Sequence, residues 1–319
     1  MKTKPTRKLA DLSEEELWEF LAACRWPRGF QCPKCMWQQR ASDKGTGAAH
    51  ARGAVKSRSR SPTSFPAGWK TKQNRIVCQN CGHQASLTSG TWLHGTRIPL
   101  AKLRDAVVAF AGAEKGISAE HLGECLSIAV PSARRLLAIF RFVLRSGAGD
   151  RLGGVVAVDE AVWESPRRTK PKNGKAWIII AAEKRTAPHG RIGLRTNPNA
   201  IDIDMAEKVR KMVKPKSTIE TRRPEVYEKW LDQEYLFRNV QTASGTIGKD
   251  LLPACGKVAA YVSDILQNTY RSAFPLDHLQ SFLNEIVFRW NYRGSPDEAA
   301  PALLARLVPQ YEPPDDGVL

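Results

Sequence analysis

The chain has 319 residues, and its 42% hydrophobic and 25% charged residues are ordinary for a folded globular protein. No apolar run approaches the roughly 18 residues of a transmembrane helix, and the basic N-terminal segment lacks the apolar stretch of a secretory signal, so we expect a cytosolic protein without membrane contact. The net charge of +17 favours a polyanionic partner such as nucleic acid. The alternative is a basic enzyme that does not bind nucleic acid.

The N-terminal part predicts a helix followed by a cysteine-containing module. Residues 12–24 have apolar side chains at helical spacing after an acidic first turn. Two C-x-x-C pairs come next, and residues 38–75 between them carry nine basic residues against one acid and almost no aliphatic side chains. This composition predicts a flexible basic loop inserted in the module. Its candidate DNA-contacting residues are Arg58, Arg60, Lys70 and Lys72.

The two cysteine pairs predict a structural zinc ribbon. In a reducing compartment such pairs are typical of metal ligands rather than disulfides. Zinc takes four tetrahedral ligands, and two short knuckles deliver them in pairs, which leaves no open position for catalysis. Gly82 suits the tight turn of the second knuckle, whereas Met36 in the equivalent place predicts a less regular first knuckle. The ligands would be Cys32, Cys35, Cys78 and Cys81; the alternative is two unrelated cysteine pairs.

Residues 99–146 predict three helices, over 99–116, 117–126 and 131–147. The last two, with a tight turn between them, fit a helix-turn-helix. Arg134 and Arg135 fall in the first turn of the second helix, where a recognition helix meets base edges. The alternative is an ordinary helical hairpin with a solvated basic face.

The remaining chain mixes strands and helices after a linker at 146–151. Strands are predicted over 153–163, 176–184, 191–197 and 217–221, and helices over 202–215, from 223 and within 250–293. The chain is thus expected to be an α+β multidomain protein. Its expected parts are 1–98 (helix and zinc ribbon), 99–146 (helix-turn-helix-like), 152–295 (mixed α/β domain) and 296–319 (Pro-rich tail).

Five segments in this order resemble one protein family: RWPRGFQCPKC, CQNCGHQASLTSGTWLHGTRIPLAKL, KGISAEHLGECL, GVVAVDEAVW and HLQSFLNEIVFRWNYR. They are similar to bacterial insertion-sequence transposases with an N-terminal zinc ribbon and a DDE catalytic domain, over residues 15–293. The resemblance implies an RNase H-like domain, two Mg²⁺ ions and cut-and-join chemistry at the ends of a mobile element. It also implies double-stranded DNA as partner and a nucleoid-associated location in the bacterial cytoplasm, and leaves a homo-oligomer open.

The catalytic acids of that family match only in part. The resemblance places the first acid at Asp159, followed by Glu160, but Arg222 stands in the second position and Lys257 near the third. The nearest substitutes, displaced by about 7–10 Å along a strand or helix, are Glu220, Asp250 and Asp264. We therefore expect a transposase-like DNA-binding protein whose strand-transfer activity is lost or impaired. The alternatives are an active, Mg²⁺-dependent transposase using displaced carboxylates and a zinc-ribbon transcription regulator.

Overall fold

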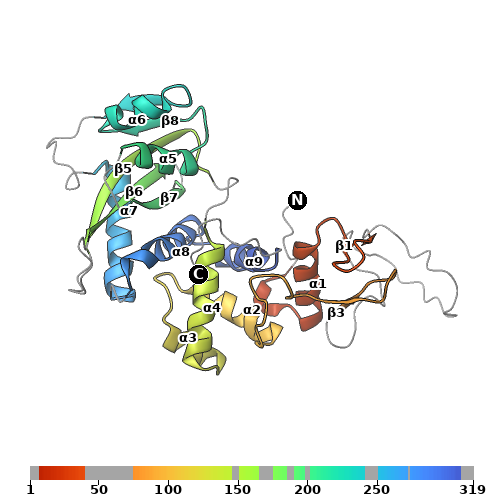
Figure 1. Cartoon of the computed structure of the whole chain (residues 1–319). Helices are drawn as coiled ribbons and strands as arrows, with labels where there is room; N and C mark the ends of the chain where they lie inside the picture. The colour runs from red at the N-terminus through yellow and green to blue at the C-terminus, as the bar shows by residue number, and fades with distance from the viewer. Residues whose placement is uncertain are drawn as a thin grey trace. The chain divides into compact units, whose positions relative to one another are not determined.

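The computed structural model describes residues 7–39, 75–145, 151–164, 175–184, 190–197, 202–240, 251–271 and 274–309. The chain forms two compact units, one of Met1–Gly112 with Pro296–Leu319 and the other of Ala113–Ser295 (Figure 1). This division differs from the expected boundaries. The helix after residue 99 belongs with the cysteine module and the C-terminal segment, whereas the two helices of the expected helix-turn-helix belong with the sheet.

The first unit is built on three helices that pack against one another. Ser13 and Glu16 form a capping box that starts the first of them. Apolar side chains at helical spacing, such as Leu17 and Leu21, are fully buried. The three helices are α1 (Glu14–Arg25), α2 (Leu100–Gly112) and α9 (Pro296–Leu307), with a short 3-10 turn, η1 (Leu9–Asp11), before α1.

Helix α9 corrects the expectation of a Pro-rich tail over 296–319, as far as residue 307. Pro296 occupies the first turn, where a missing N–H costs little, but Pro301 lies inside the helix and removes a backbone hydrogen bond. Leu303, Leu304 and Leu307 are fully buried, and α9 packs against α2. Burial of this apolar face therefore outweighs the cost of the internal proline.

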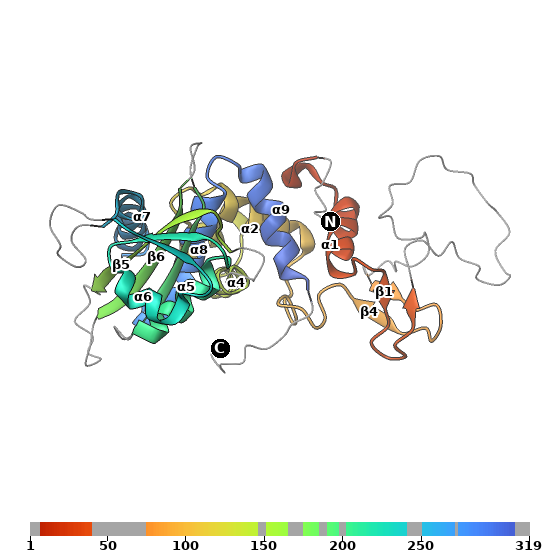
Figure 2. The ribbon, with the colours of Figure 1, turned by 90° about the horizontal axis from the view of Figure 1, so that it is seen from above.

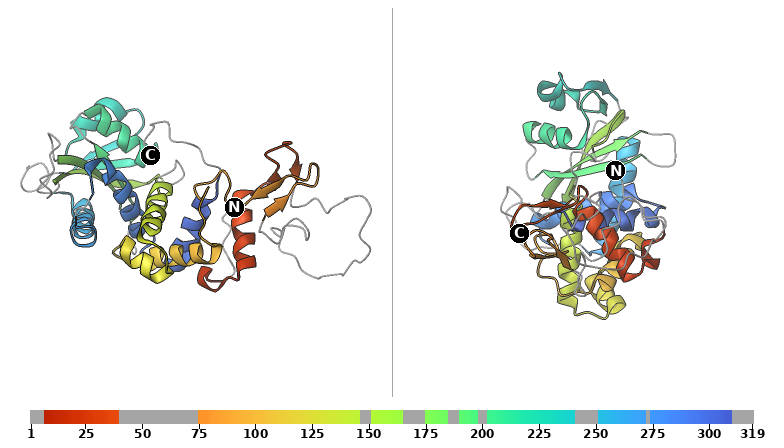
Figure 3. Two further views of the ribbon diagram at one scale, coloured as in Figure 1. Left: turned by 60° about the horizontal axis from the view of Figure 1, so that its bottom comes forward. Right: turned by 90° about the vertical axis from the view of Figure 1, so that its right-hand side faces the viewer.

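Two short antiparallel hairpins form the cysteine module of this unit, and they lie side by side next to α1 (Figure 3). The first hairpin pairs β1 (Phe30–Gln31) with β2 (Gln38–Gln39), and the second pairs β3 (Arg75–Val77) with β4 (Gln84–Ser86). The expected loop over 38–75 is therefore shorter at both ends. The rest of it, with Arg58, Arg60, Lys70 and Lys72, lies outside the described residues.

The second unit contains a mixed five-stranded sheet of order β7-β6-β5-β8-β9. The three strands β5, β6 and β7 pair antiparallel, whereas β8 runs parallel to β5 and β9 parallel to β8. The structure confirms the four predicted strands and adds β9, which the sequence did not indicate. Their bounds are β5 (Val155–Glu164), β6 (Lys175–Glu183), β7 (Ile192–Asn197), β8 (Thr218–Thr221) and β9 (Leu236–Asn239).

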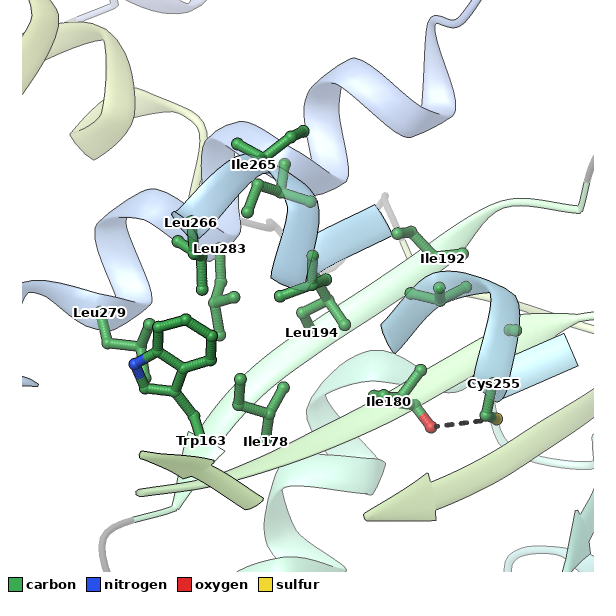
Figure 4. Close-up of a cluster of buried hydrophobic side chains, with 14 of the residues drawn as sticks. Trp163, Ile178, Ile180, Ile192, Leu194, Cys255, Ile265, Leu266, Leu279 and Leu283 are labelled. Atoms are coloured by element: carbon green, nitrogen blue, oxygen red, sulfur yellow. Dashed lines mark hydrogen bonds between the residues drawn. The ribbon is translucent and has the colours of Figure 1, made fainter. Parts of the chain in front are cut away.

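Helices cover both faces of this sheet (Figure 2). On one face lie α7 (Pro253–Asp264) and α8 (Leu279–Asn291), joined through a π-helical turn η3 (Ile265–Thr269) and a 3-10 turn η4 (Leu276–His278). Figure 4 shows their core, in which Trp163 of β5 lies beside Leu279 of α8. The other face packs against α5 (Asp202–Met212) and α6 (Pro224–Leu231). Alternate residues of β5 therefore face opposite cores.

Two further helices, α3 (Ala119–Leu126) and α4 (Val130–Val143), confirm the predicted helical pair. The turn between them passes through Ser127 in the left-handed region, at φ 50°. Gly123 allows the close approach, because a Cβ there would lie 3.1 Å from the carbonyl oxygen of Ile128. Helix α4 packs against α8. Among the described residues, no helix has the length and hydropathy needed to cross a membrane.

Candidate functional site

The four predicted cysteine ligands converge at the tips of the two hairpins. All four sulfur atoms lie within 4.8 Å of one another. Cys32 Sγ is 3.6 Å from Cys81 Sγ, and Cys35 Sγ is 3.7 Å from Cys78 Sγ. A tetrahedral ion with metal–sulfur bonds of about 2.3 Å would place its sulfur ligands about 3.8 Å apart. The cluster therefore has the geometry to hold one metal ion.

The backbone of the two knuckles repeats the same pattern. In the first, the N–H of Met36 donates to the carbonyl of Cys32; in the second, the N–H of Gly82 donates to that of Cys78, both at 2.9 Å. Met36 adopts φ 57° and Gly82 φ 69°. The expectation that methionine makes the first knuckle less regular is thus wrong for the backbone, because Met36 takes up the left-handed conformation that glycine adopts more easily.

The thiols of the cluster influence one another's ionisation. Asn80 donates to Cys35 Sγ at 3.6 Å and, with the backbone N–H of Trp37, lowers the pKa of Cys35 to about 6. The backbone N–H of His83 lowers the pKa of Cys81, but partial desolvation and the neighbouring thiols outweigh it and raise that pKa to about 12. A metal ion would allow all four sulfur atoms to be thiolates, because its charge compensates theirs.

The cysteine module is attached to α1 through one arginine. The guanidinium of Arg25 donates to the carbonyl oxygens of Ser86, at 2.6 Å, and of Leu87 and Ser89. Burial lowers the pKa of Arg25 to about 10. The last turn of α1 therefore holds the chain that leaves β4, a connection that the sequence did not reveal.

Asp159 lies in the middle of the central strand β5 and is 1% exposed. Its carboxylate accepts four hydrogen bonds. Arg222, at the end of β8, donates from Nη2 to Oδ1 at 2.6 Å and from Nε to Oδ2 at 3.1 Å. The backbone N–H groups of Glu160 and Leu252 donate to Oδ1 and Oδ2 at 3.0 and 2.8 Å. Both oxygens are therefore already engaged by donors, and the adjacent charge is positive.

The other candidate carboxylates have partners of their own. Glu220 pairs with Lys184 and with Arg238, the latter at 2.9 Å, and these contacts hold its pKa below the usual value. Asp264 accepts from Asn268 at 2.6 Å and pairs with Lys115 at 3.3 Å. Asp250 lies outside the described residues. Among the described residues, the cysteine cluster is the one group of three or more side chains with metal-ligand spacing.

Two further residues that the resemblance singles out are Glu160 and Lys257. Glu160 faces the opposite side of the sheet, where the hydroxyl of Tyr227 donates to it, and burial raises its pKa. Lys257, expected near the third acid position, is exposed on α7. Of the two basic residues expected near acid positions, Arg222 therefore reaches Asp159, whereas Lys257 is exposed to solvent. The donation from Leu252 at the start of α7 had no signal in the sequence.

Arg134 and Arg135 are exposed in the N-terminal half of α4. Arg134 lies 3.6 Å from Glu120 of α3, with both side chains more than 60% exposed. Such an exposed pair contributes little and leaves the guanidinium available.

Further along α4, a buried carboxylate fixes the helix to the sheet domain. Glu285 of α8 is fully buried and accepts from Arg141 of α4 at 2.7 Å, from Arg289 at 2.9 Å and from Tyr270 at 2.6 Å. Burial alone would raise the pKa of Glu285, but the two arginines outweigh it and lower that pKa. This network attaches the C-terminal half of α4 to α8.

Comparison with known proteins gives no independent assignment. No protein-family model matches the chain, and no curated protein sequence is significantly similar to it.

Proposed function

We propose that this chain is a zinc-containing DNA-binding protein of the transposase type, whose DDE-type carboxylate site no longer supports metal-dependent strand cleavage. One observation carries the second half of this proposal. Asp159, the residue placed first among the catalytic acids by the resemblance, is held by Arg222 at the position where the family has its second acid.

The chemistry of Mg²⁺ explains why this contact matters. Mg²⁺ dehydrates reluctantly and is held by carboxylates together with substrate phosphates, and two-metal cleavage needs carboxylates around a common point. Both oxygens of Asp159 are engaged, and Glu220 is turned toward Lys184 and Arg238. A guanidinium beside Asp159 compensates its charge, which removes the attraction that would hold the ions.

The fold supports the family assignment. The sheet places Asp159 on its central strand, with helices on both faces and three antiparallel strands next to two parallel ones. This arrangement is compatible with the RNase H-like domain that the resemblance implies. The cysteine cluster supports zinc in particular, because four thiolates at tetrahedral spacing are typical of structural zinc sites.

Without strand cleavage, the proposed activity of this chain is binding to double-stranded DNA. The net charge of +17 provides sequence-independent affinity, and the exposed pair Arg134 and Arg135 on α4 offers direct contacts in the major groove. Because Glu285 holds α4 against α8, we expect the helix to meet DNA without reorganising.

The test combines binding and cleavage on one labelled duplex. The full-length protein should bind it, and with six to ten phosphate contacts the affinity should fall roughly 10³- to 10⁵-fold between about 50 and 200 mM salt. Arg134→Ala with Arg135→Ala should reduce sequence preference more than total affinity. Salt-insensitive affinity, or none, would refute DNA binding.

Cleavage is measured in the same samples with Mg²⁺ or Mn²⁺. We expect no nicking above the background of Asp159→Asn. Metal-dependent nicking by the wild-type protein that disappears in Asp159→Asn would instead support an active transposase.

A further inference from the structure

The tip of the first knuckle differs from that of the second in the side chains it presents. Met36 and Trp37 take the positions that Gly82 and His83 take in the second knuckle, since the carbonyls of Trp37 and His83 accept equivalent hydrogen bonds from Cys32 and Cys78. The backbone is therefore the same. What differs is that two large apolar side chains replace a glycine and an imidazole.

These side chains face solvent. Met36 is 64% and Trp37 36% exposed, and Lys34, in the same knuckle, is exposed as well. Met36 also holds φ 57°, a conformation that glycine adopts freely and other residues only at a cost. A methionine here is thus unfavourable both for its backbone and for its exposure, and neither the knuckle turn nor the metal ligands require it.

Backbone hydrogen bonds hold the tip of the first knuckle. The carbonyl of Trp37 accepts from the N–H of Cys32, and the N–H of Met36 donates to the carbonyl of Cys32, both at 2.9 Å. The indole therefore projects from a peptide that the cysteine cluster holds on both sides. A metal ion on the four sulfur atoms would fix it further, so that little entropy is lost when the ring meets a ligand.

We propose that Lys34, Met36 and Trp37, here termed the knuckle tip, bind unpaired bases of DNA. This inference rests on the proposed DNA binding and specifies one contact within it. An aromatic ring beside a cation is the combination that binds single-stranded nucleic acid, because every base offers a face for stacking while the cation meets the backbone. Methionine is among the apolar side chains that wedge between bases.

Charge favours a nucleic acid over a protein as the occupant. The chain has a net charge of +17, and the 40–74 segment, which follows the knuckle tip in sequence, contains eight basic residues and one acid. In a paired duplex the base faces are covered by their neighbours. The knuckle tip therefore selects a distorted or unpaired site over a regular duplex.

The experiment compares two labelled oligonucleotides by fluorescence anisotropy: a fully paired duplex and the same duplex with a short central run of mismatches. The full-length, metal-loaded protein should prefer the mismatched duplex by roughly 5- to 150-fold, the range expected for stacking of one base. The double variant Met36→Gly with Trp37→His copies the second knuckle, and it should lose this preference while it still binds the paired duplex.

Two controls accompany it. Trp230→His removes another exposed tryptophan, 39% exposed on α6, and should keep the preference. Trp37→Leu keeps an apolar side chain without an aromatic face and should also lose the preference. If the double variant releases its metal, Trp37→Leu becomes the variant that tests the inference.

The outcomes separate the two proposals. Salt-sensitive binding of the paired duplex without any preference in the wild-type protein would overturn the knuckle-tip inference and leave the proposed DNA binding standing. A preference for the mismatched duplex that survives in both Trp37 variants would also overturn the knuckle-tip inference. That result is expected if the knuckle tip contacts a protein and not DNA. Absence of binding to either oligonucleotide would overturn both proposals.

Discussion

Removal of Arg222 tests the buried ion pair that this residue forms with Asp159. The side chain of Arg222 is 9% exposed and that of Asp159 2%. Arg222→Leu deletes two charge-assisted hydrogen bonds, each contributing about 1.5–3 kcal/mol, and leaves the carboxylate with two backbone donors but no opposite charge beside it. Breaking a buried pair in this way costs about 3–5 kcal/mol. We expect the second unit to lose stability by that amount.

A neighbouring arginine provides the matched control. Arg223 is 3.8 Å from Glu225, with the two side chains 27% and 69% exposed. Arg223→Leu should cost less than Arg222→Leu, because solvent screens its pair with Glu225, although the charge of Arg223 also acts on the buried Glu160.

A second substitution tests the cause of the loss. Asp159→Asn removes the uncompensated charge and keeps an oxygen that can accept from Leu252. Added to Arg222→Leu, it should restore on the order of 1–3 kcal/mol.

The assay must report on the sheet itself, because two units need not unfold in one transition. Hydrogen exchange of the amides in β5 and β8, measured across a urea series, gives the local free energy of opening. Equal losses for Arg222→Leu and Arg223→Leu would refute the reasoning, as would a further loss when Asp159→Asn is added.

Two other predictions concern the metal and the buried carboxylate. Cys78→Ser should abolish the binding of the one zinc ion per chain that we propose, and unfold the hairpins while sparing residues beyond 150; metal analysis of protein purified without chelators that finds no zinc in the wild type would refute the site. Arg289 and Arg141 hold the pKa of Glu285 in the folded protein below its usual value of 4.5. The ionised carboxylate therefore stabilises the fold fully above pH 4.5, and this contribution is lost as the pH falls through the lower pKa of the folded state. Unfolding free energies from about pH 7 to pH 3 should therefore fall in acid, and more steeply in the wild type than in Glu285→Gln; parallel curves would contradict this.

Much of the local structure could be predicted from the sequence, because it depends on neighbouring residues. The apolar spacing in residues 12–24 predicts α1, and the pair of helices α3 and α4 follows from the same kind of periodicity. The spacing of the two C-x-x-C pairs indicates the cysteine cluster. That position 222 carries an arginine and not an acid is likewise readable from the sequence, since only the identity of the residue is needed.

Tertiary contacts decided the rest. The predicted helix over 99–116 ends at Gly112. The next three carbonyls accept from side chains of α7, of α8 and of the turn between them: Arg289 donates to Ala113, Tyr261 to Glu114 and Thr269 to Lys115. These donors are about 150 or more residues away in the chain. No local pattern could place them.

The same reason applies to the surroundings of Asp159 and to α9. Asp159 receives a backbone donor from Leu252, 93 residues further on, and only the folded sheet brings α7 to it. The proline-containing C-terminal segment is helical because α2 covers its apolar face. The sequence by itself determined the elements with a clear local pattern, which are the cysteine pairs, the helical pair and the strands β5 to β8, but not β9 or α9. Their partners were decided by packing between distant segments, because a buried charge or apolar face is stabilised by whatever the whole fold places against it.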